Sequence, residues 1–260
     1  MTRLDVWLAE HGLAESREKA QALVMAGRVR VDGQPATKPG VRVKDGAAVA
    51  VEAGPGHVGR GALKLAGALG AFAVSPAGRV AIDVGASTGG FTDVLLARGA
   101  ARVYAIDVGR GQLHERLRQD PRVVVRDRTN ARQLSPEVVP EPCSLAVMDV
   151  SFISVRLILE ALRGVLAPGA EAVVLVKPQF EVGREQVGRG GVVRDPALHL
   201  AALHDVARAA QQCGYGVRGA CASPVTGAEG NREFFLHLVP GADPLPGDEL
   251  LDVLRKAVEP

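Results

Sequence analysis

Short apolar runs alternate with segments of helical periodicity over most of the chain, from residue 61 onward. Runs such as VAIDV and AVVLV lack polar alternation, which predicts strands covered on both faces, in a mostly parallel sheet with right-handed crossovers. The stretch over residues 215–239 predicts instead two long strands in an antiparallel hairpin at the sheet edge. We therefore expect an α/β fold, with a Rossmann-like sheet over residues 61–260.

Residues 1–52 have a different pattern, typical of a small α+β domain. Ser16 is placed to act as the N-cap of a segment with helical periodicity. Alternating valines then flank the tight turn at Asp32 and Gly33, and the alternation resumes further on, which predicts a hairpin-rich sheet after the helices. Residues 53–60 are rich in Gly and Pro and predict a linker between two domains.

The composition excludes several classes of protein. No apolar run approaches the ~18 residues of a membrane span, and the start, MTRLDVWLAEHG, lacks the apolar core of a signal peptide. We therefore expect a cytoplasmic protein with no membrane contact. The cysteines Cys143, Cys213 and Cys221 form no C-x-x-C pair, which favours reduced thiols and no metal site. One Trp, two Tyr and six Phe supply few rings for stacking single-stranded nucleic acid.

A glycine-rich turn predicts a nucleotide pocket. The strand RVAIDVG runs directly into ASTGGFTD, so backbone amides at the start of a helix can approach a ligand closely. The spacing departs from G-x-G-x-x-G, which weakens a nicotinamide interpretation. Asp107 ends the next strand, where a carboxylate can accept both ribose hydroxyls of an adenosine cofactor. Asp127 ends the third strand and is either a second cofactor contact or a carboxylate that caps the next helix.

Four further side chains stand at the ends of predicted elements: Lys64, Asp149, Lys177 and Glu233. Lys177 ends the apolar run AVVLV, where an unpaired charge would be costly, so an ion pair with Asp149 is expected at the edge where such sheets bind ligands. Two of the four also fit ordinary structural roles. Lys64 fits a helix lysine that extends to solvent, and Glu233 fits a solvent-facing strand residue.

The segment from RLDVW to RVKDG, residues 3–46, resembles the S4 RNA-binding domain. The resemblance implies contact with structured RNA through Arg3, Arg17, Lys19 and Lys38, by neutralising phosphates rather than by reading bases. The charge distribution agrees, because residues 1–44 hold eight Lys or Arg against five Asp or Glu, whereas the second domain holds 22 of each. Taken singly, each of these cations fits ordinary solvated surface equally well.

The order Lys, Asp, Lys, Glu resembles the tetrad of the RrmJ/FtsJ-type ribose 2′-O-methyltransferases. With GRGALK, IDVGASTGGFTD, MDVSFIS, VKPQFEVG and GNREFF after an S4 domain, the whole chain resembles the TlyA (hemolysin A) family of ribosomal RNA 2′-O-methyltransferases. The resemblance implies a class I methyltransferase sheet and S-adenosylmethionine as cofactor. It also implies ribosomal RNA or ribosomal subunits as partner, with a cytidine ribose in 16S or 23S rRNA, or both, as the target.

The resemblance assigns roles to the tetrad, Lys64, Asp149, Lys177 and Glu233. Lys177 either accepts the hydroxyl proton, if it is neutral part of the time, or stays charged and stabilises the developing oxyanion while water takes the proton. Asp149 holds Lys177, Lys64 contacts the substrate ribose or phosphate, and Glu233 orients the lysines. The expected cofactor residues are Asp83, Gly85, Ala86, Ser87, Gly89, Gly90, Phe91, Asp107, Asp127 and Asp149. Further expected RNA contacts are Arg60, Arg128 and Arg184, and Phe152 packs either on a ligand or in the core.

Three other functions compete with this interpretation. One is an RNA-binding or ribosome-assembly protein with an inactive methyltransferase domain, which the complete tetrad argues against. A second is a cytolysin, as the hemolysin name suggests, although no membrane-active segment supports it. The third is a nicotinamide oxidoreductase on the same fold. A monomer is favoured for the oligomeric state.

Overall fold

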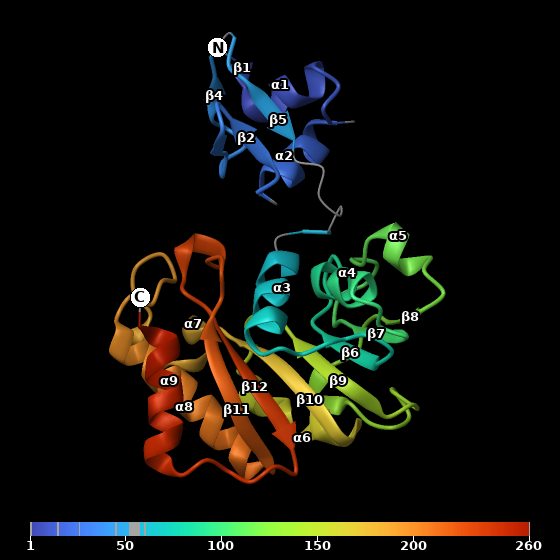
Figure 1. Ribbon diagram of the computed structural model, residues 1–260, viewed down its shortest axis with the longest axis vertical. Helices are drawn as coiled ribbons and strands as arrows, with labels where there is room; N and C mark the ends of the chain where they lie inside the picture. Colours follow the sequence, from blue (N-terminus) through green and yellow to red (C-terminus); the bar gives the residue numbers. More distant parts are fainter. Residues whose placement is uncertain are drawn as a thin grey trace. The chain divides into compact units, whose positions relative to one another are not determined.

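The computed structural model describes residues 2–14, 16–25, 27–44, 46–51, 58–59 and 61–259. It separates into two units, Met1–Ala62 and Leu63–Pro260, each with its own core (Figure 1). The expected linker lies outside the described residues except for residues 58 and 59, so the domain boundaries drawn from the sequence stay a prediction.

The first unit places two helices among five short strands. Its elements are β1 (Thr2–Arg3), α1 (Leu4–Glu10), α2 (Arg17–Met25), β2 (Val29–Val31), β3 (Gln34–Pro35), β4 (Arg42–Val43) and β5 (Val49–Val51). The strands form two sheets rather than one: β4 pairs antiparallel with β1, and β2 lies between β3 and β5. The expectation that the helices precede all of the strands is therefore wrong, because β1 lies before α1 and its partner β4 comes from the far end of the unit.

Local chemistry explains where the elements of the first unit begin and turn. The Ser16 hydroxyl accepts a hydrogen bond from the Lys19 amide at 3.1 Å, as expected of an N-cap. Asp32 and Gly33 both have positive φ, at 50° and 78°, which suits the tight turn between β2 and β3. The core is aliphatic and is formed by Leu4, Leu8, Ala20, Val24, Val29, Ala36 and Val43.

The second unit is built on a seven-stranded sheet in the order β11-β12-β10-β9-β6-β7-β8. All pairings among the last five are parallel, whereas β12 is antiparallel to both of its neighbours. This confirms the expected parallel sheet with an antiparallel hairpin at one edge. The strands are β6 (Val80–Val84), β7 (Arg102–Ile106), β8 (Val123–Arg126), β9 (Cys143–Met148), β10 (Leu166–Val176), β11 (Tyr215–Ala222) and β12 (Phe234–Pro240).

Helices cover both faces of this sheet (Figure 1). Side chains of α6, α8 and α9 form one large core with alternate residues of the central strands, such as Ile82, Met148 and Val174. Alternate positions on the strands face the other way, so each central strand is apolar on both faces, as the sequence predicts. The helices are α3 (Gly61–Ala71), α4 (Gly90–Ala97), α5 (Glu115–Arg118), α6 (Leu159–Arg163), α7 (Pro178–Glu181), α8 (Pro196–Gln212) and α9 (Gly247–Val258).

Within the described part of the chain, none of these helices has the length and apolar character needed to cross a membrane.

Candidate active site

Strand register brings three of the four expected site residues to one edge of the second unit's sheet. In the parallel pair β9–β10, Met148 lies beside Val174, and Asp149 follows at the end of β9. In the antiparallel pair β10–β12, Val176 lies opposite Phe234. Lys177 and Glu233 occupy the next positions along these two strands, so both stand at the carboxyl end of β10, close to the end of β9.

Lys177 and Asp149 form the ion pair that the sequence predicts. The Lys177 Nζ lies 2.6 Å from Asp149 Oδ1 and donates a second bond to the Ser151 hydroxyl at 2.8 Å. Lys177 is buried, and the side chain of Asp149 is 21 % exposed, so the pair lies at the boundary between the core and solvent. An ion pair in this position is held in one geometry and has one side open to a ligand.

Lys64 and Glu233 form a second ion pair. Lys64 Nζ lies 2.5 Å from Glu233 Oε2, and the two residues are 8 % and 3 % exposed. These contacts rule out a helix lysine that extends to solvent and a solvent-facing glutamate. Gly227 packs so close to the Glu233 carboxylate that a Cβ at this glycine would collide with it. The tetrad is therefore organised as two pairs, with Glu233 bound to Lys64 rather than to both lysines.

The glycine-rich turn after β6 requires glycine at two positions. Gly85 has a φ of +85°, and a Cβ there would collide with the backbone carbonyl of Asp149. Gly89 has a φ of +102°, and its Cβ would collide with the side chains of Leu117 and Leu113. The turn is thus packed against the end of β9 on one side and against α5 on the other, which brings its backbone next to the Lys177–Asp149 pair.

A cavity of about 490 Å³ opens beside this turn. Four of the expected cofactor residues line it: Gly85, Ser87, Asp107 and Asp149. Most of the other lining residues carry no signal in the sequence, although several follow Asp127 or belong to the motif MDVSFIS. They are Ile106, Val108, Gln112, Thr129, Asn130, Ala131, Arg132, Val150, Ser151, Phe152, Ile153 and Ile158.

Asp107 is fixed by backbone amides at the rim of the cavity. Its Oδ2 accepts from the Ser87 amide and its Oδ1 accepts from the Gly109 amide, both at 2.7 Å. A carboxylate has about four acceptor positions, so two of them remain for hydroxyl groups of a ligand. Val108, the next residue, is 74 % exposed and also lines the cavity, where it offers an apolar surface.

Asp83 lies beneath the turn rather than in the cavity wall. Its carboxyl group is fully buried, its Oδ2 accepts from the Thr92 hydroxyl at 2.7 Å, and its Oδ1 has no hydrogen-bond partner among the described residues. Burial raises the pKa of Asp83 to about 7, and the nearby charge of Asp149 acts in the same direction, whereas the Thr92 bond opposes it. Asp83 can therefore change its charge near neutral pH.

Besides Asp83, five of the expected cofactor residues lie outside the cavity lining. Phe91 is buried against Phe235, with ring centroids 6.2 Å apart, so its side chain does not line the cavity and its contact with the cofactor stays a prediction. Ala86, Gly89 and Gly90 belong to the packed turn. Asp127 also lies outside the lining. Its carboxylate accepts from the Gly111 amide at 3.0 Å and from Arg118 at 3.1 Å.

Phe152 is 91 % exposed, so it does not pack in the core. It lines the cavity, has a φ of +64°, and its ring centroid lies 5.2 Å from that of Phe180. The Phe180 ring is in turn 5.9 Å from Lys177 Nζ. An aromatic surface therefore stands at the mouth of the cavity, beside the first ion pair.

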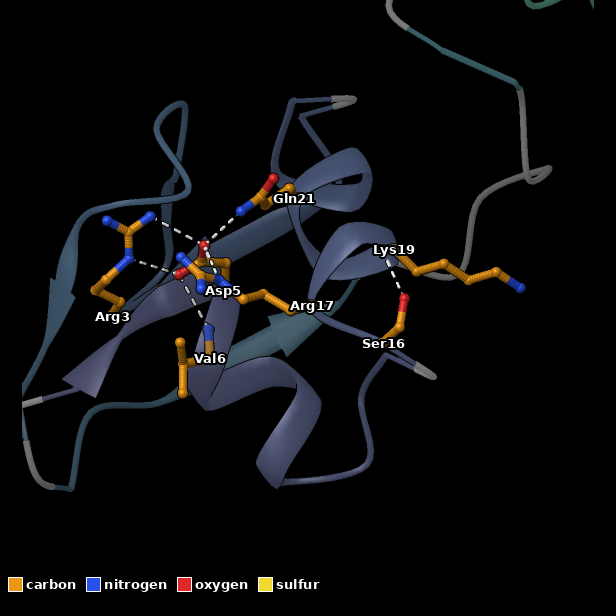
Figure 2. A network of polar contacts seen from close by, with 7 residues as sticks. All are labelled: Arg3, Asp5, Val6, Ser16, Arg17, Lys19 and Gln21. Atoms are coloured by element: carbon orange, nitrogen blue, oxygen red, sulfur yellow. Dashed lines mark hydrogen bonds and ion pairs between the residues drawn. The ribbon is translucent and has the colours of Figure 1, made fainter.

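The expected RNA-binding residues of the first unit include two arginines bound to a buried carboxylate (Figure 2). Asp5 accepts two bonds from Arg3 and one from Arg17, all at 3.0 Å, and one from Gln21 at 2.7 Å. Arg3, Gln21 and Arg17 hold the pKa of Asp5 well below its usual range, although its burial acts against them. Both guanidinium groups remain about half exposed, so Asp5 orients them at the surface.

Other expected RNA-binding cations are also exposed. Lys19 extends away from the Asp5 network (Figure 2), and Lys38 is exposed. Arg42, which the sequence analysis did not select, lies opposite Arg3 in the β1–β4 pair and is exposed. No sequence signal marks Arg42, because only the pairing places it there. In the second unit Arg128 and Arg184 are exposed, and Arg60 lies outside the described residues.

Comparisons with known proteins agree with this architecture. Residues 57–239 match the FtsJ-like methyltransferase family, and residues 2–49 match the S4 domain. The chain is 51 % identical to the 16S/23S rRNA (cytidine-2′-O)-methyltransferase TlyA of Mycobacterium tuberculosis, over 98 % of this chain and 97 % of that protein. It is 39 % identical to Hemolysin A of Brachyspira hyodysenteriae, over 91 % and 99 %. The solved structure of a proposed hemolysin from Streptococcus thermophilus is 43 % identical over 98 % and 95 %, with a TM-score of 0.76.

Proposed function

The chain belongs to the TlyA (hemolysin A) family of FtsJ-like methyltransferases with an S4 domain, and on this premise we propose that it methylates a ribose 2′-hydroxyl of ribosomal RNA. The target base is a cytidine, in 16S rRNA, 23S rRNA or both, as in the name of the M. tuberculosis relative. The observation that carries the proposal is the Lys177–Asp149 ion pair, whose carboxylate residue lines a cavity of nucleoside size. We further propose that the protein acts in the cytoplasm as a monomer.

The residues around the cavity suit S-adenosylmethionine. Asp107 has acceptor positions left for the ribose hydroxyls, Val108 offers an apolar surface to the adenine, and Asn130 offers an amide near it. Asp149 lines the cavity together with Gly85, and its carboxylate suits the positive methionine end of the cofactor. S-adenosylmethionine supplies an electrophilic methyl group on its sulfonium.

Lys177 is the residue that we assign to the reacting hydroxyl. Asp149 and Ser151 hold its Nζ at a fixed point beside the cavity, so a bound ribose meets it in one orientation. The hydroxyl proton passes to Nζ if the amine is neutral. If it is an ammonium, Nζ donates a hydrogen bond to the developing oxyanion and the proton passes to water. The Lys64–Glu233 pair occupies the neighbouring strand end, and we assign Lys64 to the substrate ribose or phosphate.

The S4 domain supplies RNA affinity in this proposal. Arg3, Arg17, Lys19 and Lys38 neutralise phosphates and position the RNA without reading its sequence. The half-exposed guanidinium groups of Arg3 and Arg17, held by Asp5, support this assignment because they are oriented before RNA arrives. We assign Arg60, Arg128 and Arg184 to further backbone contacts.

The test is methyl transfer from labelled S-adenosylmethionine to 30S subunits, 50S subunits and protein-free ribosomal RNA. We expect label at a ribose, recognised because the chain resists alkaline cleavage at that nucleotide. Lys177→Ala should lower kcat by about 100-fold or more, whereas Lys256→Ala, which changes an exposed lysine of α9, should leave it unchanged. Tight cofactor binding without transfer to any of the three substrates would point to a non-catalytic RNA-binding protein.

A further inference from the structure

Glu181 is a buried carboxylate that binds a neighbouring loop. It is 6 % exposed and lies at the end of α7, four residues after Lys177. Its oxygens accept from the Ser154 hydroxyl at 2.6 Å, from the Val155 amide at 2.8 Å and from Arg156 Nε at 3.3 Å. Its backbone carbonyl accepts from Arg156 Nη2 at 3.1 Å. One residue of α7 thus makes four hydrogen bonds to the segment that follows β9.

That segment, residues 151–156, connects the site to α7 at both of its ends. At its start, the Ser151 hydroxyl accepts from Lys177 Nζ at 2.8 Å. At its end, Ser154, Val155 and Arg156 are bound to Glu181. The loops that follow β9 and β10 are therefore joined at two points, one at the catalytic ion pair and one at Glu181.

Phe152 lies between the two points in a conformation that needs support. Its φ of +64° is rare for an aromatic residue, and its side chain is almost fully exposed, so burial does not stabilise it. Such a conformation persists where the surrounding structure holds it. Burial raises the pKa of Glu181, and the bonds from Ser154, Val155 and Arg156 act against this shift. These bonds therefore stabilise the carboxylate as well as the loop.

We propose that Glu181 is a positioning residue for methyl transfer: by holding residues 151–156 against α7, it keeps Ser151 on Lys177 and Phe152 at the mouth of the cavity. Glu181 itself does not line the cavity, so it acts through these two residues. The proposal rests on the proposed function for its catalytic consequence. Its structural part, that Glu181 immobilises the loop, stands without it.

The kinetic test compares Glu181→Gln and Glu181→Ala with Glu185→Gln, a matched change of an exposed carboxylate four residues further along the chain. We expect Glu181→Ala to lower kcat at least tenfold, with Glu181→Gln less affected because its amide oxygen still accepts from Val155. The dissociation constant of S-adenosylmethionine should change less than threefold, since the turn and Asp107 are untouched. Glu185→Gln should behave like the unmodified protein. Unchanged kcat in both Glu181 variants would overturn the proposal.

A double-mutant cycle separates positioning from general loss of stability. If Glu181 acts through the loop, Glu181→Gln should lower kcat much less in a Ser151→Ala, Phe152→Ala protein than in the unmodified one. Additive losses would overturn the proposal. Ser154→Ala removes one hydrogen bond to Glu181 from the loop side and leaves Glu181 in place. We expect it to lower kcat by a smaller factor. This variant keeps the test valid if the Glu181 variants misfold.

A fluorescence measurement tests the loop without methyl transfer. Trp7 is the chain's one tryptophan, so a Trp7→Phe, Phe152→Trp protein has a single probe at the loop. Glu181→Ala should lower the anisotropy of this probe, and Glu185→Gln should not. Unchanged anisotropy would overturn the structural part. If the unmodified protein transfers no methyl group, the proposed function is refuted, and the catalytic part of this proposal with it. Lower anisotropy in Glu181→Ala would still support the structural part, that Glu181 immobilises the loop.

Discussion

Asp5 in the first unit and Asp83 in the second are both fully buried, yet their carboxyl groups have opposite electrostatic behaviour. Arg3, Gln21 and Arg17 donate to Asp5 and keep its pKa below the usual range. Asp83 receives one side-chain bond, from Thr92, and burial raises its pKa to about 7. Burial sets the cost of a charge, and the partners that the fold supplies decide whether the charge is kept.

The difference matches what each unit has to do. In the first unit, the negative charge of Asp5, in the first turn of α1, holds two guanidinium groups at the surface, where phosphates can reach them. In the second unit, a weakly paired carboxyl group lies beneath a turn that packs on Asp149, next to a cavity assigned to a positively charged cofactor. The first arrangement is stable at neutral pH, and the second changes charge there.

Removing the charge of Asp5 should have the largest effect. We expect Asp5→Asn to lower the free energy of unfolding of the first unit by about 2 kcal/mol at pH 7, because hydrogen bonds to a charged group are lost. A lowered pKa stabilises the folded state above the ordinary pKa and loses this effect as pH falls through the folded value, so the difference should shrink near pH 3. Trp7 fluorescence during urea unfolding measures it.

The control for this change is Glu10→Gln, which alters an exposed carboxylate of the same helix. Equal midpoints for Asp5→Asn and the unmodified protein at pH 7 would mean that the arginines do not stabilise the unit.

Removing the charge of Asp83 should have a smaller effect of opposite sign. A raised carboxyl pKa means that the folded state loses stability as pH rises from about 4 towards 7. The free energy of unfolding of the second unit should therefore be about 1–2 kcal/mol higher in Asp83→Asn than in the unmodified protein at pH 8. At pH 4.5 the two values should differ little. Calorimetry without cofactor measures this, with Asp205→Asn on the exposed side of α8 as control. A difference independent of pH would contradict the assignment.

The smallest effect should come from one of the surface cations. Arg17→Ala should weaken RNA binding by about threefold and lower the slope of log affinity against log salt by about 1, because one phosphate contact is lost. Filter binding over a range of salt concentrations measures both. Arg255→Ala on α9 is the matched control. If the slope for Arg17→Ala stays the same, the Asp5 network does not face the RNA.

Local patterns in the sequence were enough to predict most elements. The N-cap at Ser16, the turn at Asp32 and Gly33, the buried strands and the antiparallel hairpin at the edge all agree with the structure. Each depends on neighbours in the chain: on the period of apolar side chains, or on residues that tolerate a given φ. The Lys177–Asp149 pair was also predictable, because a charge that ends a buried strand needs a partner at the same sheet edge.

Only the tertiary structure decided which side chains meet across long separations. The sequence contains no signal that β4 pairs with β1 and brings Arg42 beside Arg3, or that Phe91 packs on Phe235. The same holds for Glu181, an unremarkable acid in the sequence that binds the loop after β9. Periodicity and turn chemistry determine local conformation, whereas the partner of a buried charge depends on strand register and helix packing, which many distant residues settle together.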